Sequence, residues 1–308
     1  MNYKEIIVVV GFGWVGQANA IALRSLGYRV FYYDPGNPTH HYVDRYASFY
    51  GQLERLSTVD AKDSEDTCYI VCVGDKVSED GVQDISAIEA ALDSLKLTKG
   101  SLVLRSTILP DRLGDLSFDV YLPEFLHEKK AVEECVDPYL LVIGRKTDVA
   151  MPSFLNLWKK QARKTFVGTP EEAAYIKYLS NAWNALRIAF VNEFGDTIAA
   201  PTDRQNVSSI EKIIDFLFDK RGYMRYGRSY GGHCLPKDTR AFFTWYKQKG
   251  HTVSVLEGAH MSNAAHQVIE FQNPHLPEWF SEWPTKHMSG KAAFRELLYA
   301  IRKKLKLV

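Results

Sequence analysis

The sequence predicts an α/β fold in which an N-terminal doubly wound parallel sheet is followed by an all-α domain. Residues 5–10 form a continuous apolar, β-branched run, as found in strands buried on both faces of a parallel sheet. Strand-like and helix-like segments then alternate through the first half of the chain. From residue 170 to residue 200, by contrast, the sequence reads as one long helix.

The strands and helices of the first half follow from local patterns. A glycine-rich hexapeptide at 11–16 follows the first strand and opens an Ala- and Leu-rich helical pattern that ends at Gly27. A helix is also expected at 85–95. Helices between parallel strands imply right-handed crossovers that cover both faces of the sheet. Further strands are expected at 28–33, 67–73, 101–106 and 139–143.

The second half is predicted to be helical. Pro170 suits the first turn of the long helix, and Glu171 and Glu172 interact favourably with the positive end of its dipole. We expect three parts: a cofactor domain at 1–168, a helical domain at 169–272, and a connector with a basic, amphipathic helix at 273–308. Further helices are expected at 207–218, 238–249 and 253–272.

The composition excludes several classes of protein. The chain has 308 residues, of which 46% are hydrophobic and 24% charged, as in soluble globular proteins and unlike collagen-like or low-complexity chains. No apolar run is long enough for a transmembrane helix, and the N-terminus lacks the pattern of a secretory signal. Four cysteines do not make a disulfide framework at this length. We therefore expect a cytoplasmic protein.

The net charge of +1 is unevenly distributed. Residues 286–308 contain seven lysines and arginines against one glutamate, so the rest of the chain is net negative. The main domains thus lack the excess of basic residues that is typical of nucleic-acid-binding proteins. The basic tail fits a solvated helix face, with contact to an anionic surface as the alternative. The apolar residues of this tail lie at helical spacing, which favours a helix packed on the rest of the protein over a membrane anchor.

The glycine-rich hexapeptide predicts a dinucleotide site. Gly11 would allow the tight turn, Gly13 the approach of a pyrophosphate, and Gly16 the close packing of helix on strand. Asp34 ends the second strand, where a carboxylate binds both ribose hydroxyls and repels a 2′-phosphate. This context favours a Rossmann-type domain that binds NAD rather than NADP, although a glycine turn in another α/β fold is the alternative.

A second group of chemically active residues occupies 231–238. Its two glycines let the backbone approach a ligand, and His233, Lys237 and Asp238 place charges around the thiol of Cys234. A cationic, partly exposed surrounding favours the nucleophilic thiolate. The alternative is a buried, inert cysteine.

Two further pairs have i, i+4 spacing. Lys177 and Asn181 share one face of the long helix and could stabilise an oxyanion at one point, or they could lie on a solvated face. Glu124 and Glu128 have the same spacing and, taken alone, indicate only a helix start with acidic residues.

Together these segments resemble the UDP-glucose/GDP-mannose dehydrogenase family, over residues 1 to about 270. The glycine-flanked Cys-x-Pro-Lys-Asp and the Lys-x-x-x-Asn helix followed by Asn-Glu are the most specific parts of the resemblance. The matching segments are 11–16, Asp34, Ser106-Thr107, 122–128, 171–194 and 230–238.

The resemblance implies that an alcohol carbon of a sugar or nucleotide sugar is oxidised twice, to a carboxylic acid, with two NAD⁺. Cys234 would form a thiohemiacetal and then a thioester, which water hydrolyses. Lys177 and Asn181 would hold the oxyanion, and Asp238 would orient water and share proton transfer with Lys177. The other implied catalytic residues are Thr107 and Glu124, which would position the water, and Glu128, which would shape the site.

The same resemblance implies a homodimer built on the 170–200 helix, and it implies no metal. The implied cofactor-binding residues are Gly11, Gly13, Trp14, Val15, Gly16, Asp34, Val73, Gly74, Ser106, Thr107 and Lys237. The implied substrate-binding residues are Glu124, Phe125, Leu126, Lys177, Asn181, Arg221, Tyr230, Gly231 and Cys234, with Arg221 reaching across the dimer interface.

The chain also departs from the family pattern. Family members carry a third, C-terminal α/β domain that binds the nucleotide half of the substrate, and no such alternation follows residue 270 here. Asp75 stands where threonine is usual, beside the expected pyrophosphate, unless Lys76 compensates its charge. Lys129 replaces a common glycine, and Tyr139 a usual arginine. Two alternatives therefore stay open: the same chemistry on a non-nucleotide or carrier-bound alcohol, or an inactive NAD-binding scaffold.

Overall fold

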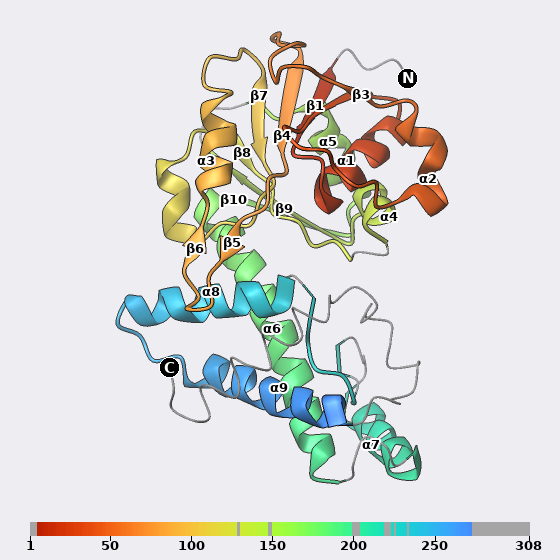
Figure 1. Cartoon of the computed structure of the whole chain (residues 1–308), viewed down its shortest axis with the longest axis vertical. Helices are drawn as coiled ribbons and strands as arrows, with labels where there is room; N and C mark the ends of the chain where they lie inside the picture. The colour runs from red at the N-terminus through yellow and green to blue at the C-terminus, as the bar shows by residue number, and fades with distance from the viewer. Residues whose placement is uncertain are drawn as a thin grey trace. The chain divides into compact units, whose positions relative to one another are not determined.

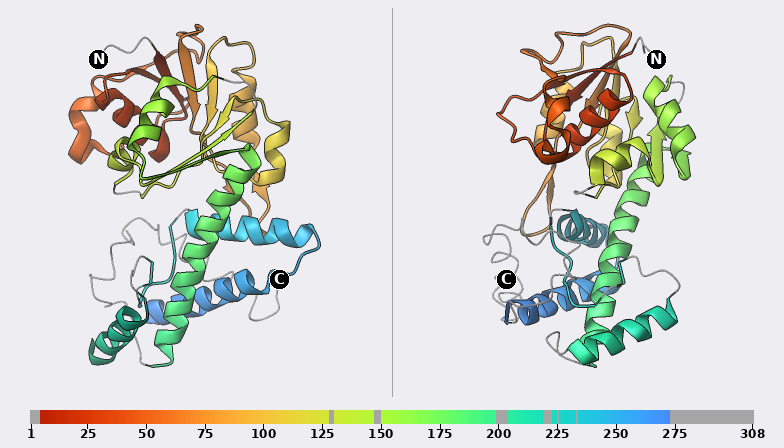
Figure 2. Two further views of the ribbon diagram at one scale, coloured as in Figure 1. Left: turned by 180° about the vertical axis from the view of Figure 1, so that it is seen from behind. Right: turned by 90° about the vertical axis from the view of Figure 1, so that its right-hand side faces the viewer.

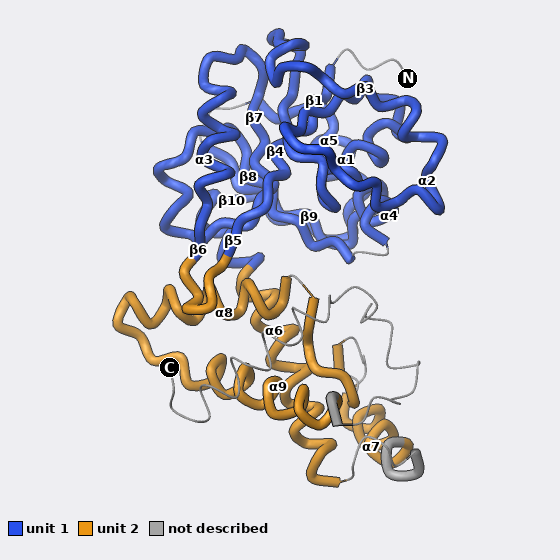
Figure 3. The backbone as a smooth tube through the Cα atoms, viewed as in Figure 1, with its two compact units in different colours: residues 1–76, 83–177 blue, residues 77–82, 178–308 orange. Residues whose placement is uncertain are grey.

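A computed structural model describes most of the chain, and its residues cluster into two compact units (Figure 3). The sheet unit comprises residues 1–76 and 83–177, and the helical unit comprises residues 77–82 and those from 178 onward. The described residues are 5–127, 130–146, 150–198, 204–218, 223–224, 226–232 and 234–272.

The sheet unit is built on an eight-stranded sheet with the order β10-β9-β8-β7-β4-β1-β2-β3. All neighbouring strands are parallel except β8 and β9, which pair antiparallel. The strands are β1 (Ile6–Val10), β2 (Arg29–Tyr33), β3 (Glu54–Arg55), β4 (Thr67–Val71), β7 (Ser101–Leu104), β8 (Val120–Tyr121), β9 (Leu140–Arg145) and β10 (Lys164–Gly168). A separate two-stranded sheet joins β5 (Lys76–Val77) to β6 (Gln83–Asp84).

Helices cover both faces of the large sheet (Figures 1 and 2). On one face, α1 (Trp14–Ser25), α4 (Ala131–Val136) and α5 (Ser153–Gln161) pack on alternate residues of the strands. On the other face lie α3 (Ser86–Asp93), the 3-10 turn η1 (Pro110–Asp115) and the start of α6 (Pro170–Asp196). The helix α2 (Val43–Tyr50) follows β2. Central strands such as β1 and β4 are thus buried on both sides, which explains their unbroken apolar sequences.

The helical unit contains the rest of α6 together with α7 (Arg204–Leu217), α8 (Cys234–Gln248) and α9 (Ser254–Gln272). Its apolar residues form two small clusters, one around Val191 and Ile214 and one around Ile188 and Leu235. Many of its other buried side chains are polar, among them Asn192, Asn263 and His266. Polar contacts therefore take a large part in holding this unit together.

The structure confirms the predicted fold class and corrects several details. The sheet is not wholly parallel, because the short β8 pairs antiparallel with β9. Residues 122–127 are not helical, so Glu124 does not open a helix. The helix expected at 238–249 begins at Cys234, which places the thiol in its first turn. The connector and basic helix expected at 273–308 lie outside the described residues.

Candidate active site

The glycine loop has the backbone that a pyrophosphate site requires. Gly11 adopts a φ of +87°, and a Cβ there would lie 3.1 Å from the backbone of Cys72. A Cβ on Gly16 would lie 2.0 Å from the Gly11 carbonyl oxygen, so only glycine permits this packing of α1 on β1. A Cβ on Gly13 would meet no atom within 4 Å, and no side chain caps α1 at this residue. The first-turn N–H groups are therefore available for an anion.

Asp34 lies directly after β2 and touches the glycine loop. Its Oδ2 accepts the N–H of Phe12 at 2.7 Å, and its Oδ1 accepts the N–H of Gly36 at 2.8 Å. Each carboxylate oxygen has a second acceptor position, so Asp34 retains the capacity to bind ribose hydroxyls. These contacts fit the role predicted for Asp34 in binding the cofactor.

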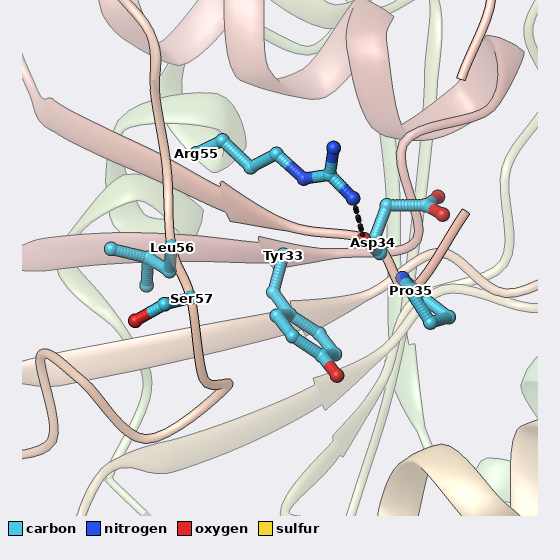
Figure 4. A pocket seen from close by; sticks show the side chains of 6 residues that line it. All are labelled: Tyr33, Asp34, Pro35, Arg55, Leu56 and Ser57. Atoms are coloured by element: carbon cyan, nitrogen blue, oxygen red, sulfur yellow. Dashed lines mark hydrogen bonds between the residues drawn. The ribbon is translucent and has the colours of Figure 1, made fainter. Parts of the chain in front are cut away.

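A cavity of about 430 Å³ opens beside Asp34 (Figure 4). Arg55 crosses it and donates to the carbonyl oxygens of Asp34 and Gly36 at 2.7 and 2.6 Å. The guanidinium thus holds the turn after β2 in place. The lining residues are Tyr33, Asp34, Pro35, Arg55, Leu56 and Ser57. The cavity therefore lies at the end of β2, next to the residue that bonds the glycine loop.

Gln17 holds the glycine loop in place through side-chain hydrogen bonds, a role that no sequence pattern indicated. Its amide is fully buried in α1, and its Nε2 donates to the carbonyl oxygens of Phe12 and Thr39, both at 2.7 Å. Its Oε1 accepts the N–H of His41 at 2.8 Å, and the His41 ring stacks on Trp14. Val15, also predicted at the cofactor, lies half-buried in the same turn. One side chain therefore ties this loop to the segment before α2.

The loops after β4 and β7 lie side by side because these strands are neighbours. The Ser106 hydroxyl donates to the Val73 carbonyl oxygen at 2.5 Å. Gly74 is exposed beside them and Thr107 is half-buried. The predicted cofactor residues Val73 and Ser106 are thus brought together.

Gln83 is a second residue that the sequence did not point to. Its buried amide donates to Asp75 Oδ2 at 2.7 Å and to the Thr107 carbonyl oxygen at 3.1 Å, and it accepts the N–H of Leu109 at 3.0 Å. The aspartate that departs from the family pattern therefore has an amide partner, whereas the sequence suggested compensation by Lys76. The same contacts hold the loop that carries Thr107.

Lys177 and Glu124 form a buried ion pair within the sheet unit. Lys177, 3% exposed, donates from Nζ to the Glu124 carbonyl oxygen at 2.6 Å and to its Oε1 at 2.9 Å. Burial opposes the charge of Glu124, but Lys177, the N–H of Leu126 and Arg105 outweigh it and lower the Glu124 pKa. The ammonium also lies 5.3 Å from the ring centre of Phe125. Lys177 is therefore a positioned cation and not a residue on a solvated face.

Within the helical unit, Asp238 joins Asn181 to the turn that carries Cys234. Its Oδ2 accepts the Asn181 amide at 2.7 Å, and its Oδ1 lies 2.7 Å from Lys237 Nζ. Asn181 and Asp238 are both buried, whereas Cys234 is exposed. Cys234 is the first residue of α8, where the positive end of the helix dipole favours negative charge.

Tyr230 and Gly231 lead into this turn. The Tyr230 ring is buried in the cluster that contains Leu235 and Ala259, and its hydroxyl lies 3.5 Å from His260 Nδ1. Gly231 is half-buried. The predicted site residues Glu128 and Arg221, together with His233, lie outside the described residues.

The other three cysteines differ from Cys234 in their surroundings. Burial raises the pKa of Cys72 to about 12 and that of Cys135 to about 11, with Arg105 opposing both shifts. Burial also raises the pKa of Cys68. No disulfide joins any of the four. Among the described residues, Cys234 is thus the one exposed thiol.

Within the described ranges, no cluster of His, Cys, Asp and Glu side chains is arranged to hold a metal ion. No helix of the described chain has the length and apolarity needed to cross a membrane.

Part of the chain matches the model of a known protein family. Residues 171–265 match the model of the "UDP-glucose/GDP-mannose dehydrogenase family, central domain". These residues are thus similar to the central domain of that family. The match covers α7 and α8 and most of α6 and α9, and it includes Lys177, Asn181 and Cys234. The resemblance inferred from the sequence is therefore confirmed.

Individual relatives extend the likeness to the sheet unit. The GDP-mannose 6-dehydrogenase of Pseudomonas aeruginosa is 28% identical over 76% of this chain and 63% of its own length. The UDP-glucose 6-dehydrogenase AglM of Haloferax volcanii is 26% identical over 82% of this chain and 67% of its own. The structure of a UDP-glucose dehydrogenase from Pyrobaculum islandicum, 27% identical, superposes with a TM-score of 0.70 over 87% of this chain and 71% of that one. Against the first of these relatives, the chain thus spans less than two thirds of the relative's length.

Proposed function

We propose that the protein oxidises the primary alcohol of a nucleotide sugar to the carboxylate, with NAD⁺ as oxidant and Cys234 as the covalent nucleophile. The observation that carries the proposal is the exposed thiol at the start of α8, four residues before the buried Asp238 that bridges Lys237 and Asn181. A buried carboxylate with two polar partners, one helical turn from an exposed thiol, is typical of a catalytic site. The relatives named above support the substrate class.

The sheet unit supplies the proposed cofactor site. Gly13 and the first turn of α1 would hold the pyrophosphate, and Asp34 the ribose, beside the cavity that Arg55 crosses. A carboxylate at this position disfavours a 2′-phosphate. When bound, NAD⁺ accepts a hydride in each of the two oxidations.

Cys234 converts the intermediate aldehyde into a species that can lose a second hydride. Its thiolate adds to the aldehyde carbon, a C–S bond forms, and the carbonyl oxygen takes up a proton to give a thiohemiacetal. Loss of the second hydride and of that proton leaves a thioester. Water then attacks the thioester carbon, the C–S bond breaks, and the thiolate, the carboxylate and two protons are released.

Lys177 and Asn181 are proposed to stabilise the oxygen that becomes negative in these steps. They are four residues apart on α6, so both can serve one substrate oxygen. The ion pair with Glu124 fixes the Lys177 side chain, and Asp238 fixes the Asn181 amide. Thr107 and Glu124 are proposed to position the hydrolytic water, and Asp238 to take part in its deprotonation.

The proposal is tested by incubating the full chain with NAD⁺ and a panel of UDP- and GDP-sugars while NADH absorbance is followed. At least one sugar should yield two NADH for each carboxylate formed, and Cys234→Ser should abolish acid formation. Free sugars and carrier-bound alcohols in the same panel test the alternative substrates. If the folded protein binds NAD⁺ and oxidises none of these compounds, the proposal is wrong and the scaffold alternative holds.

We further propose that α6 mediates a homodimer. Leu179, Trp183, Phe190 and Phe194 recur along this helix and are exposed, Trp183 by 55%. A contiguous apolar stripe of this kind marks an interaction surface. Trp183→Glu should therefore convert a dimer into a monomer in sedimentation velocity. Phe216→Glu, at a 90% exposed aromatic residue of α7, is the matched control and should leave the dimer intact. A monomeric wild type would contradict the proposal.

A further inference from the structure

The segment Tyr226–Tyr230 leads directly into the turn that carries Cys234, and its backbone is held by side chains. The N–H of Gly227 donates to Asn192 Oδ1 at 2.8 Å, and the N–H of Tyr230 donates to Asn263 Oδ1 at 2.7 Å. Buried backbone groups need partners, and here side chains from two helices provide them.

Each of the two asparagines bonds the segment at two points. The Asn192 amide donates to the Arg228 carbonyl oxygen at 2.7 Å, and the Asn263 amide donates to the Tyr230 carbonyl oxygen at 3.0 Å. Both asparagines are buried. A carboxamide presents a donor and an acceptor side by side, as a peptide group does. Asn192 and Asn263 therefore take the place of a neighbouring strand.

Three acidic and basic side chains complete the contacts. Asp196 accepts the Tyr226 hydroxyl at 2.9 Å and lies 2.8 Å from His266 Nδ1. Glu270 accepts the N–H of Ser229, and its Oε1 lies 3.8 Å from His266 Nε2. We call the set Asn192, Asp196, Asn263, His266 and Glu270 the polar clamp.

We propose that the polar clamp positions the Cys234 turn for catalysis, with Asn263 as its principal positioning residue. Asn263 bonds both polar backbone groups of Tyr230, and Tyr230 precedes Cys234 by four residues. Apolar side chains could fill the same volume without the desolvation that buried polar groups require. A satisfied polar network instead selects one backbone conformation. Misplacing a reacting atom by about 1 Å can cost about a hundredfold in rate, so this selection matters at a nucleophile.

The inference rests on the proposed function, because that function makes Cys234 the nucleophile. Its first test does not depend on turnover. Hydrogen exchange of the full chain is measured by mass spectrometry for the wild type, Asn263→Ala and the milder Asn263→Ser. Ser262→Ala is the control, since Ser262 adjoins Asn263 on α9 but its hydroxyl bonds Ala189.

Asn263→Ala should raise exchange in peptides covering 226–235 by about tenfold, because two hydrogen bonds are lost. Asn263→Ser should raise it less, and Ser262→Ala should not change it. Exchange in β1 and α1 should stay unchanged in all variants. Unchanged exchange at 226–235 in Asn263→Ala, or a uniform rise across the helical unit, would overturn the clamp whether or not the protein turns over a sugar.

The second test uses kinetics on whichever sugar the wild type oxidises. Asn263→Ala should lower kcat ten- to a hundredfold and leave KM for NAD⁺ unchanged, with Asn263→Ser between it and the wild type. Raised exchange with normal kcat would show that the clamp orders the segment without positioning the thiol, and would overturn the inference. An inactive wild type would instead refute the proposed function. The exchange data would then still show whether the polar clamp orders residues 226–235.

Discussion

In the sheet unit, candidate cofactor residues follow the ends of regular strands, whereas in the helical unit the candidate nucleophile Cys234 follows a segment without regular structure. Asp34 comes directly after β2, and Ser106 lies two residues beyond β7, so hydrogen bonds along the sheet fix both. Cys234 instead follows a segment whose backbone is bonded to Asn192 and Asn263. A site can thus be held by a sheet or by a few buried polar side chains, and the second arrangement is the more sensitive to single substitutions.

The largest effect is expected at the buried ion pair of the sheet unit. Lys177→Met leaves the Glu124 carboxylate buried without its cation and should lower the free energy of unfolding by about 3–5 kcal/mol. Urea denaturation measures the change. Lys96→Met removes a lysine from an exposed pair with Asp93 and should cost no more than about 1 kcal/mol. Equal losses in the two variants would show that burial of the pair does not matter.

The thiols of the two units should differ in reactivity by about a hundredfold or more. At neutral pH, the raised pKa values of Cys72 and Cys135 leave far less thiolate than an ordinary cysteine has. Iodoacetamide should therefore label Cys234 first, as measured by peptide mass spectrometry over time. Cys234→Ser should remove the fast phase. Comparable labelling of Cys72 would contradict the burial described here.

The affinity for NAD⁺ should depend on the Asp34 carboxylate. Asp34→Ala removes the acceptor for ribose and for the Phe12 and Gly36 N–H groups, so NAD⁺ should bind about ten- to a hundredfold more weakly. Isothermal titration calorimetry measures the affinity. Asp44→Ala, at an exposed residue of α2, is the control and should bind as the wild type does. An unchanged affinity in Asp34→Ala would remove this residue from the cofactor site.

The smallest effect concerns the pH dependence of the helical unit. Burial opposes the charge of His266, but Asp196, the Gly227 carbonyl and Glu270 outweigh it and raise the His266 pKa. A raised folded-state pKa means that the charged histidine stabilises the fold fully below about pH 6.5, and that this contribution is lost as the pH rises through the folded-state value. The difference in unfolding free energy between the wild type and His266→Gln should therefore shrink from pH 6 to pH 8.5. A constant difference would show that His266 does not change charge in this range.

The sheet unit could be predicted well because its patterns are local. Within residues 6–34, an apolar strand is followed by the glycine loop and then by Asp34. This order of features is typical of a dinucleotide-binding unit, so each feature could be interpreted from the sequence. The antiparallel pairing of β8 was missed because a two-residue strand leaves no periodic pattern. The early start of α8 was missed because Gly232 and Pro236 indicate a turn, whereas proline is compatible with a first helical turn.

The clamp and the two buried glutamines could not have been found from the sequence. Asn192, Asn263 and Gln83 look like ordinary polar surface residues, because their partners lie 24 or more residues away or on another element. The polarity pattern of a helix indicates which face is exposed to solvent. It does not show which polar residue forms a hydrogen bond with a backbone group far away in the sequence. For the same reason Lys177 and Asn181, predicted only as one possibility, needed the structure to show that both are buried.

The bond from the Phe12 N–H to Asp34 has a consequence for protein engineering. The Asp34 carboxylate, which would discriminate between NAD and NADP, also holds the backbone of the glycine loop and of the turn after β2. Its two oxygens accept the N–H groups of Phe12 and Gly36. Exchanging that side chain alone, in order to admit a 2′-phosphorylated coenzyme, would release the loop at the same time. A variant with altered coenzyme preference therefore needs a replacement anchor for the backbone in addition to a new cationic contact.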